Sequence, residues 1–405
     1  MMTLDKFEEA TEAVKKVILR TDLVYSDYFT EQCGNKVYLK PENMQFTGAY
    51  KVRGAYYKIS TLTKEERERG LITASAGNHA QGVAYAAKLY QAKAIIVMPS
   101  TTPLIKVNRT KSYGAEVILY GNVYDEACQY AVKLAEEQGY TFIHPFNDET
   151  VAIGQGTIAM EIFKGLPTVD IILAPVGGGG LLAGVATLAK MLNPNVKVIG
   201  VEPSGAACMK ESLKAGHVVT LPQVDTIADG TAVKTPGDVV YPYIQSYVDD
   251  IITVDDSELI VNFLDMMENH KMVVENSGLL TVAAVKHLNC KDKKVVCILS
   301  GGNMDIITVS SVVQHGLIQR GRVFTVSVLL PDRPGELVNV ASIIAETKGN
   351  VIRLDHNQFV SINRNAAVEL TITMETFGHE HKQEIVQALI DAGYNPKLCA
   401  PSKLY

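Results

Sequence analysis

Four short stretches of the sequence carry residue types that could bind and activate a small molecule. They are the turn that leads into Lys51, residues 75–79, the four consecutive glycines at 177–180 and the turn that starts at Ser300. A lysine amine is a nucleophile toward carbonyl compounds, and backbone amides in glycine-rich turns bind anions without interference from side chains. Together these stretches favour an enzyme that works through a phosphorylated, carbonyl-bearing ligand.

Lys51 is predicted to lie at the junction between a strand and a helix. Residues 37–40 have the pattern of a short strand, Pro41 and Gly48 interrupt regular structure, and residues 49–59 have a helical pattern. The partial positive charge at a helix N-terminus favours the neutral, nucleophilic form of an amine. Because most lysines are solvated and unreactive, this position alone does not establish a catalytic lysine.

The second stretch is a polar turn between a strand and a helix. Ser75, Asn78 and His79 follow the strand-like residues 72–74 and precede an alanine-rich helix at 83–89. Small residues let a ligand approach the backbone closely, and the first amides of a helix suit a carboxylate. The alternative is a tight turn with an incidental histidine, and for His79 alone that alternative is favoured.

The glycines at 177–180 lie between an apolar strand at 170–176 and an apolar helix at 181–192. Four glycines are typical of a flexible linker, but a flexible joint inside a packed strand–helix unit is unfavourable. Successive backbone N–H groups and the helix dipole can instead surround a dianion. No Gly-Lys-Ser/Thr follows, and the spacing differs from the dinucleotide pattern, so the sequence predicts another type of phosphate-binding loop.

Alternating strands and helices predict a parallel α/β fold for most of the chain. Further strands are expected at 94–99, 116–120, 196–202 and 294–299, and helices at 5–19, 103–113 and 124–137. Strands at 323–330, 349–355 and 366–373, with helices at 336–347 and 380–392, then fit a ferredoxin-like α+β domain. We expect a catalytic domain at 1–318 with a small subdomain at about 50–148, a linker at 319–322 and a second domain at 323–405.

Composition limits the classes of partner. The 405 residues are 47% apolar with a formal net charge of -6, which offers no basic surface for nucleic acid. The six cysteines are scattered without metal-binding spacing, the N-terminus lacks the pattern of a signal peptide, and no apolar run is long enough to cross a membrane. These features predict a cytoplasmic enzyme with reduced thiols, acting on a small molecule.

The four stretches, in this order, resemble the motifs of the fold-type II pyridoxal-phosphate enzymes, the tryptophan synthase β-subunit-like family. By this resemblance Lys51 forms a Schiff base with pyridoxal 5'-phosphate and later acts as the base at Cα of the substrate. The family more often has Ser-Phe where this chain has Ala49-Tyr50, so the phenol of Tyr50 is expected in the cofactor environment. The fold implied is two α/β subdomains.

The resemblance also implies roles for the other stretches. Ser75, Ala76, Gly77, Asn78 and His79 form the loop that holds the substrate carboxylate, and Asn78 bonds the ring oxygen of the cofactor. The phosphate is bound by Gly177, Gly178, Gly179, Gly180 and the amide of Leu181, and Ser300 bonds the pyridine nitrogen. A hydroxyl there does not compel ring protonation, which favours β-elimination or β-replacement over transamination.

Within the family, the whole chain is similar to threonine dehydratases with one C-terminal ACT domain. That similarity implies conversion of L-threonine to 2-oxobutyrate and ammonia, with L-serine as a second substrate, and a place in amino-acid metabolism such as isoleucine biosynthesis. Racemases of the family carry a second serine where this chain has Ala76, which argues against racemisation because alanine cannot move a proton. A serine dehydratase or racemase, a β-replacing synthase and a catalytically idle amino-acid sensor remain alternatives.

Two regulatory features follow from the same resemblance. The turn at 331–335 and the Gly-Asn before the next strand resemble an ACT domain, which implies an amino-acid effector at Asp332 and Asn350 and assembly into a homodimer or homotetramer. Glu202 matches a residue that holds a stimulating cation in several relatives. Cys208 replaces an aspartate among those ligands, and because hard cations prefer oxygen donors, a purely structural Glu202 is equally expected.

Overall fold

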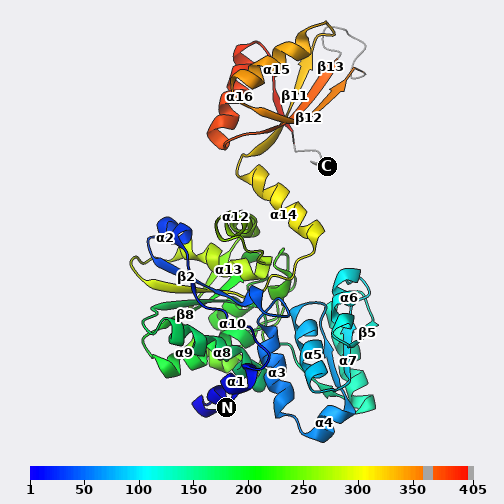
Figure 1. Cartoon of the computed structure of the whole chain (residues 1–405), viewed down its shortest axis with the longest axis vertical. Helices are drawn as coiled ribbons and strands as arrows, with labels where there is room; N and C mark the ends of the chain where they lie inside the picture. Colours follow the sequence, from blue (N-terminus) through cyan, green and yellow to red (C-terminus); the bar gives the residue numbers. More distant parts are fainter. Residues whose placement is uncertain (359–367, 400–405) are drawn as a thin grey trace. The chain divides into compact units, whose positions relative to one another are not determined.

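The computed structural model describes residues 1–358 and 368–399, and the chain divides into two compact units between Asp305 and Ile306 (Figure 1). This division precedes the helix α14 (Ile306–Gln319), whereas the predicted domain boundary lies after it. The predicted strand at 366–373 begins on two residues outside the described part of the chain.

A six-stranded sheet forms the centre of the larger subdomain. Its order is β1 (Val24–Tyr25), β2 (Lys36–Pro41), β10 (Lys294–Leu299), β7 (Ile171–Pro175), β8 (Lys197–Pro203) and β9 (Asp250–Val254). Only β1 is antiparallel to its neighbour; the remaining pairs are parallel. The carboxyl ends of β2, β10 and β7 therefore meet at one edge of the sheet, where ligands bind in open α/β folds.

The smaller subdomain has a four-stranded parallel sheet in the order β5 (Glu116–Leu119), β4 (Ala94–Met98), β3 (Leu71–Ala74) and β6 (Thr141–Phe142). Alternate residues of a strand face opposite sides. Ile96 belongs to one hydrophobic cluster with Val83 of α5 (Asn78–Leu89), while Val97 belongs to another with Ala131 of α7 (Tyr124–Gln138). Both faces of this sheet are thus covered by helices, as the apolar strands predict.

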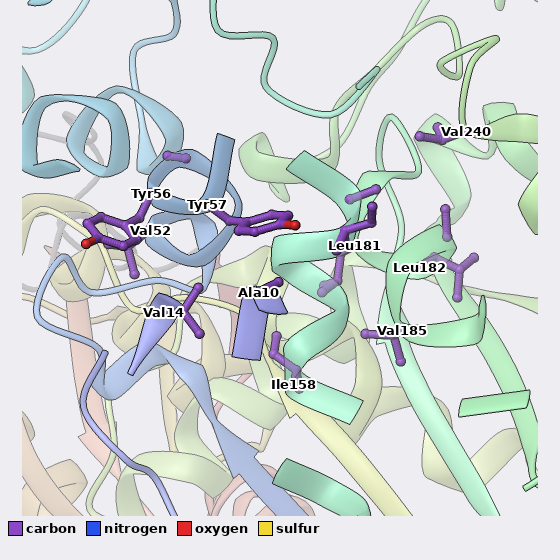
Figure 2. Close-up of a cluster of buried hydrophobic side chains, with 14 of the residues drawn as sticks. Ala10, Val14, Val52, Tyr56, Tyr57, Ile158, Leu181, Leu182, Val185 and Val240 are labelled. Atoms are coloured by element: carbon purple, nitrogen blue, oxygen red, sulfur yellow. The ribbon is translucent and has the colours of Figure 1, made fainter. Parts of the chain in front are cut away.

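The remaining helices of this unit have the following bounds: α1 (Leu4–Val14), α2 (Asp27–Cys33), α3 (Lys51–Thr61), α4 (Lys64–Arg69), α6 (Leu104–Ser112), α8 (Glu149–Gly165), α9 (Gly180–Leu192), α10 (Cys208–Ala215), α11 (Tyr241–Tyr247), α12 (Asp256–Asp265) and α13 (Asn276–Ala284). Buried side chains of α1, α3, α8 and α9 pack together in one cluster, in which Ala10, Tyr57, Ile158 and Leu181 are drawn (Figure 2). Each large apolar side chain buried in this way contributes about 1.5–3 kcal/mol.

Glycines let α3 pack closely between α5 and α8. A Cβ atom on Gly82 of α5 would lie 3.1 Å from the carbonyl carbon of Lys51, and one on Gly154 of α8 would lie 2.7 Å from the Cα atom of Gly54. A side chain at position 154 would collide with the backbone of α3, and one at position 82 would force that backbone to shift by a few tenths of an ångström. The first turn of α3, which carries Lys51, is consequently held between the two subdomains.

The second unit is a four-stranded antiparallel sheet with two helices on it. The strand order is β12 (Asn350–Asn357), β13 (Val368–Glu375), β11 (Val323–Leu330) and β14 (Lys397–Cys399), and the helices that follow β11 and β13 are α15 (Glu336–Glu346) and α16 (His379–Asp391). This is the βαββαβ order of a ferredoxin-like fold. The predicted α/β fold with an additional C-terminal α+β unit is confirmed, and β14 is a strand that the sequence pattern did not indicate.

Within residues 1–358 and 368–399, every helix is too short or too polar to span a membrane.

Candidate active site

Three of the four predicted stretches follow strand ends that converge on one edge of the large sheet, and the fourth, residues 75–79, follows β3 of the smaller sheet. Ser300 comes directly after β10, Gly177 lies two residues after β7, and the segment after β2 leads to Lys51. The turn before Lys51 is joined to the Ser300 turn: the amide of Tyr50 donates to the carbonyl oxygen of Ser300 at 3.1 Å, and the amide of Gly302 donates to the carbonyl oxygen of Gly48 at 2.9 Å. These two predicted stretches are therefore adjacent in space.

Lys51 is the first residue of α3, and it is partly buried. Its Nζ donates to the carbonyl oxygen of Pro145 at 2.7 Å and lies 5.3 Å from the centre of the Tyr50 ring. Burial lowers the pKa of the Lys51 amine to about 8, although Glu275 opposes this effect. Burial, followed by the negative charge of Glu275, raises the pKa of Tyr50. The phenol thus stays neutral beside an amine that is readily deprotonated.

A buried network of charges anchors the first turn of α3. Arg53 donates from Nε to Oε2 of Glu42 at 2.8 Å and from Nη1 to Oε1 of Glu161 at 2.6 Å, and Lys40 donates to Oε2 of Glu161 at 2.6 Å. Burial disfavours ionisation of Glu42, but Arg53 and Lys40 outweigh it and hold its pKa below the usual range. Since Arg53 is two residues from Lys51, the network fixes the direction from which the amine enters the site.

The glycine loop has the geometry of an anion site. Gly179 has φ +101°, which only glycine adopts without strain, and it precedes α9, whose first turn has no side-chain cap among the described residues. A Cβ on Gly178 would lie 2.2 Å from Cδ2 of Phe146, and one on Gly180 would lie 2.7 Å from the Phe146 carbonyl oxygen. The loop therefore carries no side chains of its own over its backbone amides, with Leu181 as the next residue of the helix.

The segment 144–147 connects the lysine to the glycine loop. Pro145 accepts the hydrogen bond from Lys51, and its neighbour Phe146 packs against Gly178 and Gly180. His144 supports this turn by accepting the amide of Asn147 at Nδ1 over 2.8 Å, and burial, followed by the nearby Lys51, lowers its pKa to about 4. His144 consequently adds no positive charge at neutral pH.

Asn78 lies at the start of α5, facing the Ser300 turn. Its Nδ2 donates to Oε1 of Glu275 at 2.7 Å, and its Oδ1 accepts from Nδ2 of Asn303 at 2.8 Å. Ser75 accepts the amide of Gly77 at 3.2 Å, which closes the turn ahead of the helix. Ser75, Ala76 and Gly77 are all partly exposed, as a ligand-binding loop requires.

His79 is positioned differently from its neighbours. It is buried, and its Nε2 lies 3.0 Å from the carbonyl oxygen of Ile143. Burial, followed by the charge of Lys51, lowers its pKa to about 3, so it is neutral. Its Nδ1 has no hydrogen-bond partner within the described residues. The backbone of His79 belongs to the loop, whereas its ring points into the packed interior.

The sequence motifs did not indicate Glu275, which lies directly before α13. Its carboxyl contacts Asn78, and burial raises its pKa to about 7 against the opposing hydrogen bond from Asn78. A Cβ on Gly301 would lie 2.3 Å from Oε1 of Glu275, so the Ser-Gly-Gly turn needs glycine there to admit the carboxyl. An acidic residue at a helix start was the available signal, but that signal predicts a cap and not a partner for Asn78.

Glu202 has a visible structural role. It is buried, and its two carboxyl oxygens accept the amides of Met209 at 2.8 Å and Lys210 at 2.9 Å, in the first turn of α10. Burial raises the pKa of Glu202 to about 7. The described part of the chain has no cluster of three His, Cys, Asp or Glu side chains suited to a metal ion. A cation at Glu202 stays a prediction.

The two predicted effector residues occupy separate positions in the second unit. Asp332 lines a cavity of about 310 Å³ together with Arg333, Glu336 and His356. Asn350 is not among the residues lining that cavity, and its Nδ2 donates to Oε2 of Glu375 at 3.2 Å. An effector contact at either residue stays a prediction.

Known proteins share this architecture and sequence. The pyridoxal-phosphate dependent enzyme family matches residues 14–301. The L-threonine ammonia-lyase of Thermotoga maritima is 42% identical over 98% of this chain and 100% of its own length. Among solved structures, the processed threonine deaminase isoform 2 of Solanum lycopersicum aligns with a TM-score of 0.74 and 38% identity over 78% of this chain and 90% of that one. Maize serine racemase aligns with a TM-score of 0.73 and 36% identity over 78% of this chain and 98% of that one.

The chain belongs to the pyridoxal-phosphate dependent enzyme family. The residues fit the cofactor: a partly buried amine of lowered pKa lies one short segment away from a glycine loop that has no side chains of its own over its amides. The aldehyde of the cofactor reacts with such an amine, and its phosphate is bound by such amides. The predicted cofactor, pyridoxal 5'-phosphate, and the predicted family are both confirmed.

Proposed function

We propose that the protein is an L-threonine ammonia-lyase, which converts L-threonine to 2-oxobutyrate and ammonia and also accepts L-serine. The observation that carries this proposal is the partly buried Lys51 amine of lowered pKa, joined through Pro145 and Phe146 to the glycine loop. The Thermotoga maritima relative, aligned over nearly the whole of both chains, supports threonine as the substrate.

In this proposal Lys51 holds the cofactor and then removes the proton from Cα of threonine. Bound pyridoxal phosphate supplies an electron-accepting ring that stabilises the negative charge left at Cα. A pKa of about 8 suits the amine to this task, because a base works best when its pKa is near the working pH. The amides of Gly177, Gly178, Gly179, Gly180 and Leu181 would hold the phosphate, Ser300 would bond the ring nitrogen, and Asn78 would bond the ring oxygen.

The loop at 75–79 supports elimination over racemisation. Racemisation needs a second acid on the side of Cα opposite Lys51, and the loop offers the methyl group of Ala76 at the position where racemases of the family have a serine. Ser75 remains in the loop, but its hydroxyl accepts the amide of Gly77. We therefore place a serine racemase second, supported by the maize neighbour at 36% identity.

The proposal is tested by an ammonia-release assay across amino acids with the wild type and Lys51→Ala. We expect release from threonine and serine by the wild type, and loss of both turnover and the visible absorbance of the lysine-bound cofactor in the variant. Steady-state turnover retained by Lys51→Ala would overturn the proposal, as would wild-type protein that stays colourless after incubation with pyridoxal phosphate.

We further propose that the second unit is an ACT domain that binds an amino-acid effector and pairs with its copy in a homodimer or homotetramer. The ferredoxin-like strand order and the cavity beside Asp332 support this role. Adding isoleucine or valine to the assay should change the threonine dependence, and Asp332→Ala should weaken that change. Free thiols at all six cysteines fit a cytoplasmic location.

A further inference from the structure

Asn78 takes part in a chain of hydrogen bonds whose direction can be deduced. Nδ2 of Asn303 lies 2.7 Å from the carbonyl oxygen of Thr47. A carbonyl oxygen only accepts hydrogen bonds, so the atom of Asn303 that faces it must be the nitrogen. The second N–H of the same amide then points to Asn78, 2.8 Å away, which must present its oxygen. The backbone of Thr47 thus determines the orientation of the Asn303 amide, which in turn favours the Asn78 oxygen on its side.

Glu275 completes this chain on the other side of Asn78. Because the oxygen of the Asn78 amide faces Asn303, Nδ2 of Asn78 faces Oε1 of Glu275 at 2.7 Å. Glu275 is itself fixed, because its amide donates to the carbonyl oxygen of Gly301 at 2.9 Å and its carboxyl occupies the space that a side chain on Gly301 would need. The Asn78 amide is therefore held from both sides by groups of opposite hydrogen-bonding polarity.

We propose that Glu275 and Asn303 are positioning residues that orient the Asn78 amide so that its remaining N–H group is presented to the ring oxygen of the cofactor. The inference rests on the proposed function, which assigns Asn78 to that oxygen. One N–H of Asn78 is used by Glu275, and within the described residues no protein acceptor takes the other. A flipped amide would present a carbonyl oxygen instead, which repels an ionised ring oxygen.

This orientation has an electronic consequence. An N–H donor stabilises the ionised ring oxygen, and with it the form of the lysine-bound cofactor that absorbs at long wavelength, whereas a carbonyl oxygen favours the hydroxyl form that absorbs at short wavelength. Hydrogen bonds to charged groups are about twice as strong as neutral ones. The absorbance of the holoenzyme therefore reports the orientation of Asn78 without requiring turnover.

The test compares holoenzyme absorbance, together with kcat and KM for threonine, in the wild type, Glu275→Leu, Glu275→Gln and Asn303→Ala. In Glu275→Leu the acceptor is lost, so we expect absorbance to move toward the short-wavelength band and kcat to fall about tenfold, with a smaller change in KM. Glu275→Gln keeps an oxygen that can accept from Asn78, while Asn303 still faces the Asn78 oxygen. It is expected to retain the long-wavelength band. Thermal unfolding of each variant checks that it is folded.

Two outcomes would overturn the inference. The first is an unchanged spectrum in folded Glu275→Leu. The second is a spectrum of Glu275→Gln that is altered as much as that of Glu275→Leu, because the effect would then come from the charge of Glu275 and not from the orientation of Asn78. If Glu275→Leu does not fold, the spectrum of Asn303→Ala tests the inference instead. This variant removes the hydrogen bond to the Asn78 oxygen and should shift the absorbance toward the short-wavelength band as well. Failure of the proposed function is distinguishable, since it would appear as a wild-type holoenzyme with the long-wavelength band but without ammonia release from threonine.

Discussion

Nζ of Lys51 donates a hydrogen bond of 2.7 Å to the carbonyl oxygen of Pro145, 94 residues further along the chain. Lys51 begins α3, whereas Pro145 lies between β6 and α8 and immediately precedes Phe146, the residue that packs against the glycine loop. The amine is therefore placed relative to the predicted phosphate site by backbone atoms, which no side-chain substitution can remove directly.

The lowered pKa of Lys51 predicts how cofactor incorporation depends on pH. Only the neutral amine attacks an aldehyde, and because burial lowers its pKa to about 8, the neutral form becomes the major one above that pH. The rate at which cofactor-free protein gains visible absorbance should rise about tenfold between pH 7 and pH 9 and then level off. A rate that continues to rise to pH 10 or beyond, as for a solvated lysine, would contradict this assignment.

Gly178→Ala should weaken cofactor binding. The added methyl group would lie 2.2 Å from the Phe146 ring, so the ring or the loop must move. Overpacking of this kind costs about 1–3 kcal/mol, and if that cost falls on the cofactor-bound state the Kd for pyridoxal phosphate increases roughly 5- to 150-fold. Titration of cofactor-free protein measures this value.

Gly165→Ala is the matched control, because its methyl group would meet only the side chain of Leu23, whose Cδ1 and Cγ would lie 3.4 and 3.6 Å away, in ordinary contact. It should leave cofactor affinity unchanged. Equal Kd values for the two variants would mean that the close packing of Gly178 does not matter for the site.

Ala76→Ser should introduce some racemisation. A hydroxyl at this position supplies the second acid that the loop lacks, on the side of Cα opposite Lys51 by the family resemblance. Chiral chromatography of L-serine reactions should then detect D-serine, at the expense of part of the ammonia release. Ala76→Gly, which adds no hydroxyl, should form none, and D-serine produced by the wild type itself would show that the loop does not set the reaction type.

Arg53→Leu should destabilise the protein by about 3–5 kcal/mol, because it leaves the buried carboxylate of Glu42 without its main partner. Urea unfolding of the cofactor-free protein measures the loss. Arg69→Leu, at an exposed position in α4, should change stability by no more than about 0.5 kcal/mol. A similar midpoint for both variants would show that the buried network adds no net stability.

Local features of the site could be predicted from the sequence because they depend on backbone geometry over a few residues. The glycines at 177–180, placed between an apolar strand and an apolar helix, have one favourable interpretation, and Gly179 does adopt the positive φ that such a loop needs. Lys51 at a helix start and Ser300 at a strand end follow in the same way from periodicity and turn residues. The order of these motifs also predicted the family.

Long-range partners could not be predicted in this way. Glu275 lies 197 residues from Asn78, and nothing in its own neighbourhood indicates a contact with that amide. For Glu202 the sequence left a cation ligand and a structural carboxylate equally open, whereas the structure places two amides of α10 on its oxygens. The sequence by itself determined which residue types occupy the turns of the site. Only the tertiary structure decided which groups face them, because burial and hydrogen-bond pairing arise from the packing of distant elements.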